Sequence, residues 1–232
     1  DLIDHGATVT RILTPDRHGS LADVPLGCPT PEDYLRPHPH FNCLVGRYAN
    51  RMSQARFRLD GVAYELDANI PPHHLHGGKH GFGLRTWSSE LIDQGVRFKL
   101  ISPDGEGGYP GELTVIAEYN LRGTTLSLRY SARTTQPTPV SLSSHHYYNL
   151  SGIQGSAIDD HRITINASAF LPVSAELTQL GRIESVTNTP FDLQNPVRIG
   201  DRLRSTHEQI QLIGGYDHTF VLTGRGLRQA AH

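Results

Sequence analysis

The chain has 232 residues, of which 37% are hydrophobic and 23 are glycine, and this is enough apolar material to bury a substantial core. Its formal charge is −2 and it has no cluster of Lys or Arg, which excludes nucleic acid and membrane surfaces as expected partners. The two cysteines form no ligand or redox spacing, and no apolar run is long enough to cross a bilayer. We therefore expect free thiols and a cytoplasmic protein with one domain over residues 1–232.

In chain order, residues 2–9 already have the pattern of strand and turn. Six prolines between Pro15 and Phe41 resist regular structure and predict long surface loops, where binding groups usually lie. Asp60-Gly61 then separates two alternating segments, 57–59 and 62–66, which is a strong hairpin signal.

Short runs rich in Val, Ile, Thr, Tyr and Phe recur between Gly, Pro, Asn and Asp, whereas amphipathic helices are scarce. This pattern predicts an all-β protein. The further expected strands are 96–102, 113–121 paired with 125–133 around a turn at 122–124, 162–167 and 218–222. Only residues 199–213 favour a short helix.

The chain contains fourteen histidines, and several of them form two clusters. Histidine is notable because its unperturbed pKa lies near neutrality, so that it exchanges protons at working pH. The first cluster occupies residues 73–82, where Gly77-Gly78 permits tight backbone geometry and close approach of a ligand.

The second cluster occupies residues 143–150. If this segment is extended, residues Ser143, His145, Tyr147 and Asn149 share one face, and the even-numbered residues share the other. A face carrying hydroxyl, imidazole, phenol and amide groups suits the floor of a cleft that binds a polyhydroxylated ligand.

Two other interpretations stand beside this one. Histidines in loops are mostly surface residues without a function. A metal site is also conceivable, because His74 with His76 and His145 with His146 offer imidazoles. Adjacent residues of a strand point in opposite directions, however, and no Cys or HExxH companion is present.

Seven short motifs give the sequence a family resemblance. In chain order they lie at 45–52 (VGRYANRM), 59–61 (LDG), 75–87 (LHGG, GF and W), 107–111 (G-YPG), 139–150 (PV to H-YYNL), 191–192 (FD) and 216–220 (YDH-F). The chain resembles the aldose 1-epimerase (galactose mutarotase) family along its whole length. This resemblance implies a large antiparallel β-sandwich of the galactose mutarotase type with few short helices, and no metal or organic cofactor.

The resemblance also implies roles for individual residues. His145 matches the family's general acid, and His76 matches the histidine that positions the sugar near the reacting centre. Asn50, Arg51 and Asp217 match sugar-binding positions. Ser141 and Ser144 stand where the family usually has asparagine, and Tyr148 where it has phenylalanine. Of these, the two serines are the departures expected to affect the orientation of the His145 ring, whereas Tyr148 is expected to be tolerated.

The family's general base is a glutamate in a segment that follows the Tyr-Asp-His motif. No glutamate in this sequence matches it, because Glu176, Glu184 and Glu208 lie outside the catalytic motifs. We therefore expect the chain to be part of a longer protein, truncated at both ends, and assign no base.

The function implied is that of an isomerase, an aldose 1-epimerase that interconverts the α and β anomers of free aldohexoses such as galactose and glucose by acid–base ring opening. The expected partner is a small sugar, and the expected assembly is a monomer or homodimer. The alternatives are a hexose-phosphate 1-epimerase of the same superfamily and a noncatalytic sugar-binding β-sandwich.

Overall fold

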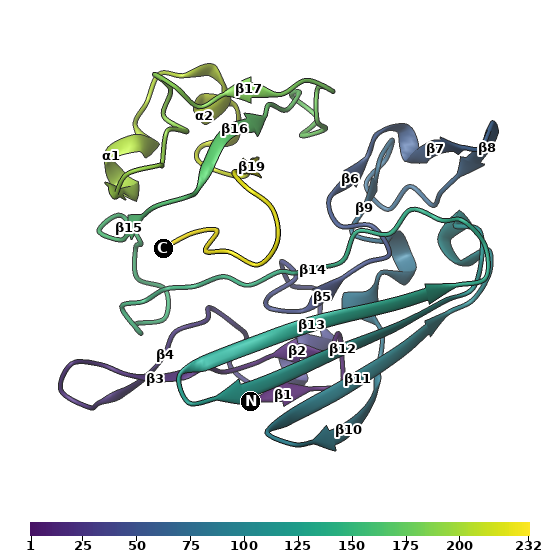
Figure 1. Ribbon diagram of the computed structural model, residues 1–232, viewed down its shortest axis with the longest axis horizontal. Coiled ribbons are helices and arrows are strands. Elements are labelled where there is room, and N and C mark those ends of the chain that lie inside the picture. The colour runs from purple at the N-terminus through teal and green to yellow at the C-terminus, as the bar shows by residue number, and fades with distance from the viewer. The chain divides into compact units, whose positions relative to one another are not determined.

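A computed structural model describes residues 1–232 (Figure 1). The chain forms two compact units, residues 1–154 and residues 155–232, and each is described by itself. Strands dominate both units, and every pair of strands is antiparallel. The expectation that residues 1–232 form a single domain stays a prediction.

The first unit contains fourteen strands and five 3₁₀ turns. The strands are β1 (Leu2–Ile3), β2 (Thr8–Val9), β3 (Leu13–Pro15), β4 (Leu21–Asp23), β5 (Leu44–Val45), β6 (Arg51–Met52), β7 (Arg56–Leu59), β8 (Val62–Glu65), β9 (His74–Leu75), β10 (Ser88–Ile92), β11 (Gly95–Ser102), β12 (Leu113–Arg122), β13 (Thr125–Thr134) and β14 (Ser143–Ser144). The 3₁₀ turns are Pro31–Leu35, Ser53–Ala55, Gly78–His80, Phe82–Leu84 and Glu106–Gly108.

The largest sheet of this unit has four strands in the order β10-β11-β12-β13, which Figure 1 shows as long neighbouring arrows. Strands β12 and β13 pair over ten residues, from Leu113 opposite Thr134 to Arg122 opposite Thr125. This hairpin and the hairpin of β7 and β8 confirm the two predicted from the sequence.

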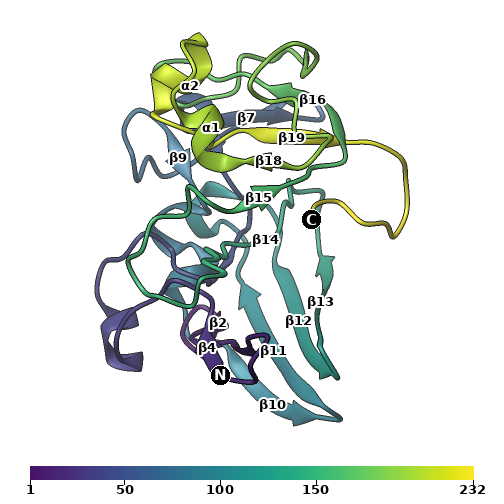
Figure 2. The ribbon, with the colours of Figure 1, turned by 90° about the vertical axis from the view of Figure 1, so that its left-hand side faces the viewer.

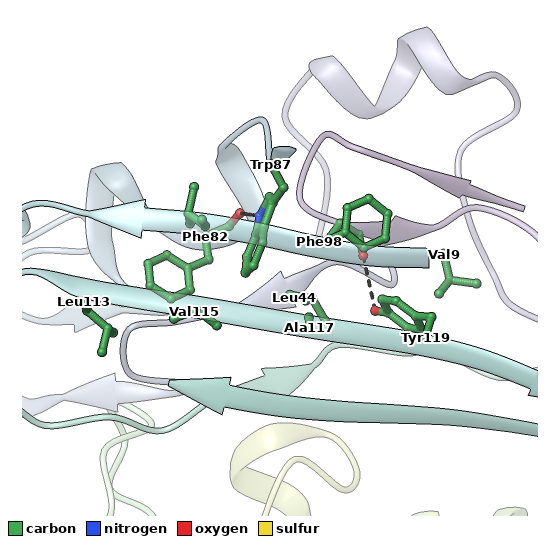
Figure 3. Close-up of a cluster of buried hydrophobic side chains, with 11 residues drawn as sticks. Val9, Leu44, Phe82, Trp87, Phe98, Leu113, Val115, Ala117 and Tyr119 are labelled. Carbon is green, nitrogen blue, oxygen red and sulfur yellow. Dashed lines mark hydrogen bonds between the residues drawn. The ribbon is translucent and has the colours of Figure 1, made fainter. Parts of the chain in front are cut away.

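One face of this sheet is apolar because the buried residues alternate along its strands (Figure 3). The buried members from β11 and β12 are Phe98, Leu100, Leu113, Val115, Ala117 and Tyr119. Trp87 and Phe82 pack on them with their rings 5.8 Å apart, edge to face. The Trp87 indole N–H also donates to the carbonyl of Phe82 at 3.0 Å, so the one polar atom of the indole is satisfied inside the core.

The second unit contains β15 (Arg162–Ile163), β16 (Ala167–Leu171), β17 (Glu184–Ser185), β18 (Val197–Arg198), α1 (Ile199–Leu203), α2 (Glu208–Ile213) and β19 (Thr219–Leu222) (Figure 2). Strand β16 is central between β17 and β19, and β15 pairs with β18. A separate core of Phe170, Val186, Phe191 and Ile210 lies in this unit.

Two expectations for the second unit are only partly right. The strand expected at 162–167 is interrupted, because Thr164 exchanges backbone hydrogen bonds with His232 and Ile165 donates to Leu193. The helix expected at 199–213 is two short helices, of which the second ends at Gly214 in the left-handed conformation. Neither helix is long enough to cross a membrane.

Two tyrosines of the main sheet allow a matched test of buried hydroxyl groups. The Tyr119 hydroxyl donates to the carbonyl of Ala7 at 3.2 Å, whereas the buried Tyr130 hydroxyl has no partner. We expect Tyr119→Phe to lower the free energy of unfolding by about 0.5–1.5 kcal/mol, because it removes a hydrogen bond. Tyr130→Phe should leave stability unchanged or raise it, because it removes an unpaired buried group. Urea denaturation measures both, and equal destabilisation would contradict this assignment.

Candidate functional site

The segment that carries His145 is held in place by its backbone. Strand β14 pairs with β5, and beyond it the N–H of His145 donates to Cys43 at 2.9 Å while its carbonyl accepts from Asn42 at 3.0 Å. The N–H of Tyr147 then donates to the side-chain oxygen of Asn42 at 3.1 Å. The segment therefore stays extended past the two residues of β14.

The two faces predicted for this segment are confirmed by ring contacts. The rings of His145 and Tyr147 lie 5.1 Å apart on one side, and those of His146 and Tyr148 stack at 5.3 Å on the other. Asn149 differs from the expectation, because it is buried and its side-chain oxygen accepts from Ser151 at the following turn. Its amide helps to end the segment.

His76 lies directly after β9, which pairs with β6 so that Arg51 is opposite Leu75. The following residue must be glycine, because a Cβ on Gly77 would lie 1.7 Å from the carbonyl oxygen of Gly46 and its φ is +86°. Glycine at position 77 of the pair noted in the sequence therefore lets the turn after His76 pack directly on the backbone of the segment that leads to β6.

Asn50 and His76 hold each other by two hydrogen bonds. The backbone N–H of His76 donates to the Asn50 carbonyl at 3.2 Å, and the backbone N–H of Asn50 donates to Nδ1 of His76 at 3.0 Å. A nitrogen that accepts an N–H cannot itself carry a proton. The neutral His76 ring therefore has its proton on Nε2, which is left as a fixed hydrogen-bond donor.

The surroundings of His76 keep this ring neutral. Burial of the imidazole is the main cause that lowers the pKa of His76 to about 3, and His40, His145 and Arg51 lower it further by like-charge repulsion. His76 thus presents an uncharged N–H at any pH near neutrality and cannot serve as the group that exchanges the proton.

Three imidazoles meet at this place. The ring of His76 lies 5.1 Å from that of His145 and 4.9 Å from that of His40, and the rings of His40 and His145 are 5.9 Å apart. His76 and His145 were predicted from the sequence, together with Asn50 and Arg51, which flank His76. His40 was missed, since it lies in the proline-rich stretch that gave no local signal beyond a surface loop.

His74, the neighbouring histidine of the first cluster, is fully buried and has a structural role. Its Nδ1 donates to the backbone carbonyl of Asp67 at 2.7 Å, and its Nε2 lies 2.8 Å from the hydroxyl of Tyr109. The same Asp67 accepts the backbone N–H of Lys79, so this network fixes both ends of the turn that carries His76.

For His74 and His76, the metal interpretation fails on the donor atoms. Both ring nitrogens of His74 are engaged, and Nδ1 of His76 accepts a hydrogen bond while Nε2 carries the proton. Neither ring has a free lone pair to offer a metal ion. Residues 1–232 contain no group of three or more His, Cys, Asp or Glu side chains arranged to hold one.

The serines at the two positions where the family usually has asparagine take part in backbone pairing. Ser144 pairs with Leu44, and Ser141 donates to the carbonyl of Arg47 and accepts from Ala49. These contacts do not depend on the side chain, so the backbone that positions His145 is kept whichever residue is present.

Asp217 belongs to the second unit, where its side chain is exposed. Its backbone N–H donates to Nδ1 of His218, whose Nε2 contacts the side-chain oxygen of Gln209 at 3.1 Å. Gln209 is buried and bonds both the N–H and the carbonyl of Val173. His218 also packs edge to face on Phe191 at 4.6 Å, so the Tyr-Asp-His motif is anchored in the core of this unit.

Comparisons with solved structures define the class of fold. The chain is similar to an aldose epimerase homologue from C. elegans, with a TM-score of 0.89, 27% identity and coverage of 99% of this chain and 70% of that chain. It is similar to a galactose 1-epimerase from Lactobacillus acidophilus, with a TM-score of 0.85, 30% identity and coverage of 98% and 67%. The fold is therefore the β-sandwich of the mutarotase type that the sequence predicted.

The sequence comparisons narrow this class to a family. The family model described as aldose 1-epimerase matches residues 1–232, so the chain belongs to the aldose 1-epimerase family. It is 45% identical to the galactose mutarotase of Bos taurus over 224 residues, and 35% identical to the aldose 1-epimerase of Escherichia coli over 237 residues. The first match includes 97% of this chain and 64% of the bovine protein. The second includes 100% of this chain and 67% of the bacterial protein. The chain thus spans slightly less than two thirds of the mammalian relatives.

The protonation of His76 can be measured directly. With ¹⁵N-labelled histidine, we expect NMR to show His76 with its proton on Nε2 at every pH from about 8 down to about 5, because its pKa is lowered to about 3. The unfolded chain takes up this proton near the ordinary histidine pKa of about 6.5. The pKa of His76 is lower in the native state than in the unfolded chain. His76 therefore contributes stability above about pH 6.5, and this contribution is lost as the pH falls toward 3. A proton on Nδ1 would contradict this tautomer.

Proposed function

We propose that the full-length protein is an isomerase that converts the α and β anomers of free aldohexoses, galactose and glucose among them, into one another. The observation that carries this proposal is the pairing of a fixed neutral donor, His76, with His145 at 5.1 Å between rings, in a chain that belongs to the aldose 1-epimerase family. Relatives named galactose mutarotase and aldose 1-epimerase support the choice of substrate.

The proposed reaction needs one proton donor and one proton acceptor. His145 donates a proton to the ring oxygen while a base takes the proton of the anomeric hydroxyl, so that the ring opens to the aldehyde. Rotation about the C1–C2 bond and closure on the other face of the carbonyl then give the second anomer. An imidazole suits this role because the same group must take the proton back on reclosure. We assign no base among residues 1–232.

The remaining site residues bind the sugar in this proposal. His76 donates from Nε2 to a sugar oxygen, and Asn50 fixes the direction of that donor by its bond to Nδ1. Arg51 offers a guanidinium close enough to lower the pKa of His76. From the family motif alone, we also propose Asp217 of the second unit as a sugar-binding residue, whose carboxylate accepts from hydroxyls. No metal or organic cofactor takes part. We further propose that the protein acts in the cytoplasm as a monomer or homodimer.

Removal of the acid should affect turnover more than binding. We expect His145→Ala to lower kcat by at least about a hundredfold, since a positioned acid contributes about 10²–10⁴-fold, while KM changes only modestly. Polarimetry of freshly dissolved α-galactose and α-glucose measures both constants. His146→Phe is the matched control, because the neighbouring ring lies on the opposite face and keeps its stacking on Tyr148. Equal rates in His145→Ala and the wild type would remove His145 from the mechanism.

Removal of His76, the fixed donor, should affect sugar binding more than turnover. We expect His76→Ala to raise KM more than it lowers kcat, because a neutral N–H that binds the sugar acts in the ground state as well as in the transition state. The same polarimetric assay separates the two constants. A fall in kcat at unchanged KM would mean that His76 takes part in the chemical step instead.

Two alternatives remain open to experiment. A hexose-phosphate 1-epimerase would bind phosphate through arginine, and Arg51 is a candidate for that contact. Inhibition of glucose mutarotation by low concentrations of glucose 6-phosphate would favour it. A noncatalytic sugar-binding protein would show heat of sugar binding in calorimetry and no mutarotation in polarimetry.

A further inference from the structure

His40 is the member of the three-imidazole group to which no role has been given. It lies immediately before a segment that is bound tightly to the His145 strand. The carbonyl of His40 accepts the N–H of Cys43, and Asn42 and Cys43 bond the backbone of His145 on both sides. The same hydrogen bonds that position His145 therefore position His40.

The His40 ring faces both histidines of the proposed site. It meets the His76 ring edge to face at 4.9 Å and the His145 ring at a tilt of 36° and 5.9 Å. Its backbone has a φ of +54°, an uncommon conformation for a residue with a side chain, and it follows directly on Pro39. Residues in such conformations persist where the surrounding structure holds them, as the backbone bonds of His40 to His38 and Cys43 do here.

The ring nitrogens of His40 are available to a ligand. Nδ1 of His76 is bonded to Asn50 and both nitrogens of His74 are bonded to protein, but the ring of His40 makes no hydrogen bond within the protein and its nitrogens reach solvent. Burial of the ring is the main cause that lowers the pKa of His40, and repulsion from His145 and His38 adds to it. The neutral ring carries one donor and one acceptor, which matches a sugar hydroxyl.

We propose that His40 is a third sugar-binding histidine, which hydrogen-bonds a hydroxyl of the substrate next to the atoms reached by His76 and His145. This inference rests on the proposed function for the identity of the ligand. Because both nitrogens of His40 are uncommitted, the ring adjusts its tautomer to donate or to accept, whereas His76 only donates. His40 thus contributes to the choice among hydroxyl configurations.

A pair of substitutions separates binding from packing. His40→Phe keeps an aromatic ring against His76 and His145 but removes both nitrogens, and His40→Gln restores a donor and an acceptor without the ring. His18→Phe is the control, since His18 lies at the exposed turn between β3 and β4, outside the site. For the full-length protein, the dissociation constant for galactose is measured by calorimetry and KM and kcat by polarimetry.

We expect His40→Phe to raise the dissociation constant and KM about three- to tenfold, the value of one hydrogen bond, with kcat changed less than about twofold. His40→Gln should recover most of the loss, and His18→Phe should match the wild type. Unchanged binding in His40→Phe, or an equal loss in His40→Gln, would overturn the proposal, because packing alone would then explain the contact.

A series of monodeoxygalactoses identifies the hydroxyl. One deoxy sugar should bind the wild type more weakly than galactose but lose nothing further in His40→Phe, since the two changes remove the same hydrogen bond. Strictly additive losses for every deoxy sugar would contradict a direct contact. A wild type that binds sugar without mutarotation refutes the proposed function but leaves this binding test intact, whereas an active enzyme with an indifferent His40 refutes only the present inference.

Discussion

The proposed site of the first unit depends on one buried amide. Asn42 has no exposed surface and uses all its polar groups: its backbone bonds His145 and Val9, and its side chain bonds Tyr147 and Leu26. Four segments far apart in sequence are thereby held at fixed separations. A side chain of another shape at this position would remove the partners of two backbone groups, the N–H of Tyr147 and the carbonyl of Leu26, and each buried group left unpaired costs about 1–3 kcal/mol.

Around this amide, buried polar groups set the chemistry of the imidazoles as well as their positions. The Arg47 guanidinium, 2% exposed, bonds the carbonyls of Ser102, Pro103 and Pro110 and so ties the chain leading to Asn50 to the loop after β11. Asn50 in turn fixes the tautomer of His76. The tautomer of the proposed binding group is thus a product of backbone geometry, and its neutral charge is mainly a product of burial.

The sequence predicted the fold class and most long elements, because alternation and turn residues are local signals. The β12–β13 hairpin and the two faces of the 143–150 segment followed from the period of two alone. The resemblance to the family supplied His76 and His145, and their proximity emerged only from the structure. His40 could not be predicted, since its place depends on the pairing of residues 42–43 with residues 145–147, about a hundred positions away. The prediction of one continuous strand at 162–167 was wrong for the same reason. Thr164 and Ile165 bond to His232 and Leu193, and no local sequence pattern reveals these partners.

The hydrogen bond from Asn50 to His76 also disfavours ligands that place a positively charged nitrogen beside His76. The exposed edge of His76 is an N–H that cannot reverse, and the Arg51 guanidinium stands near enough to lower the pKa of its imidazole. The N–H groups of an ammonium at this point would face the Nε2–H of His76, and its positive charge would be repelled by the Arg51 guanidinium. For the proposed site, we therefore expect amino sugars and protonated iminosugars that place nitrogen there to bind more weakly than neutral sugars of the same shape.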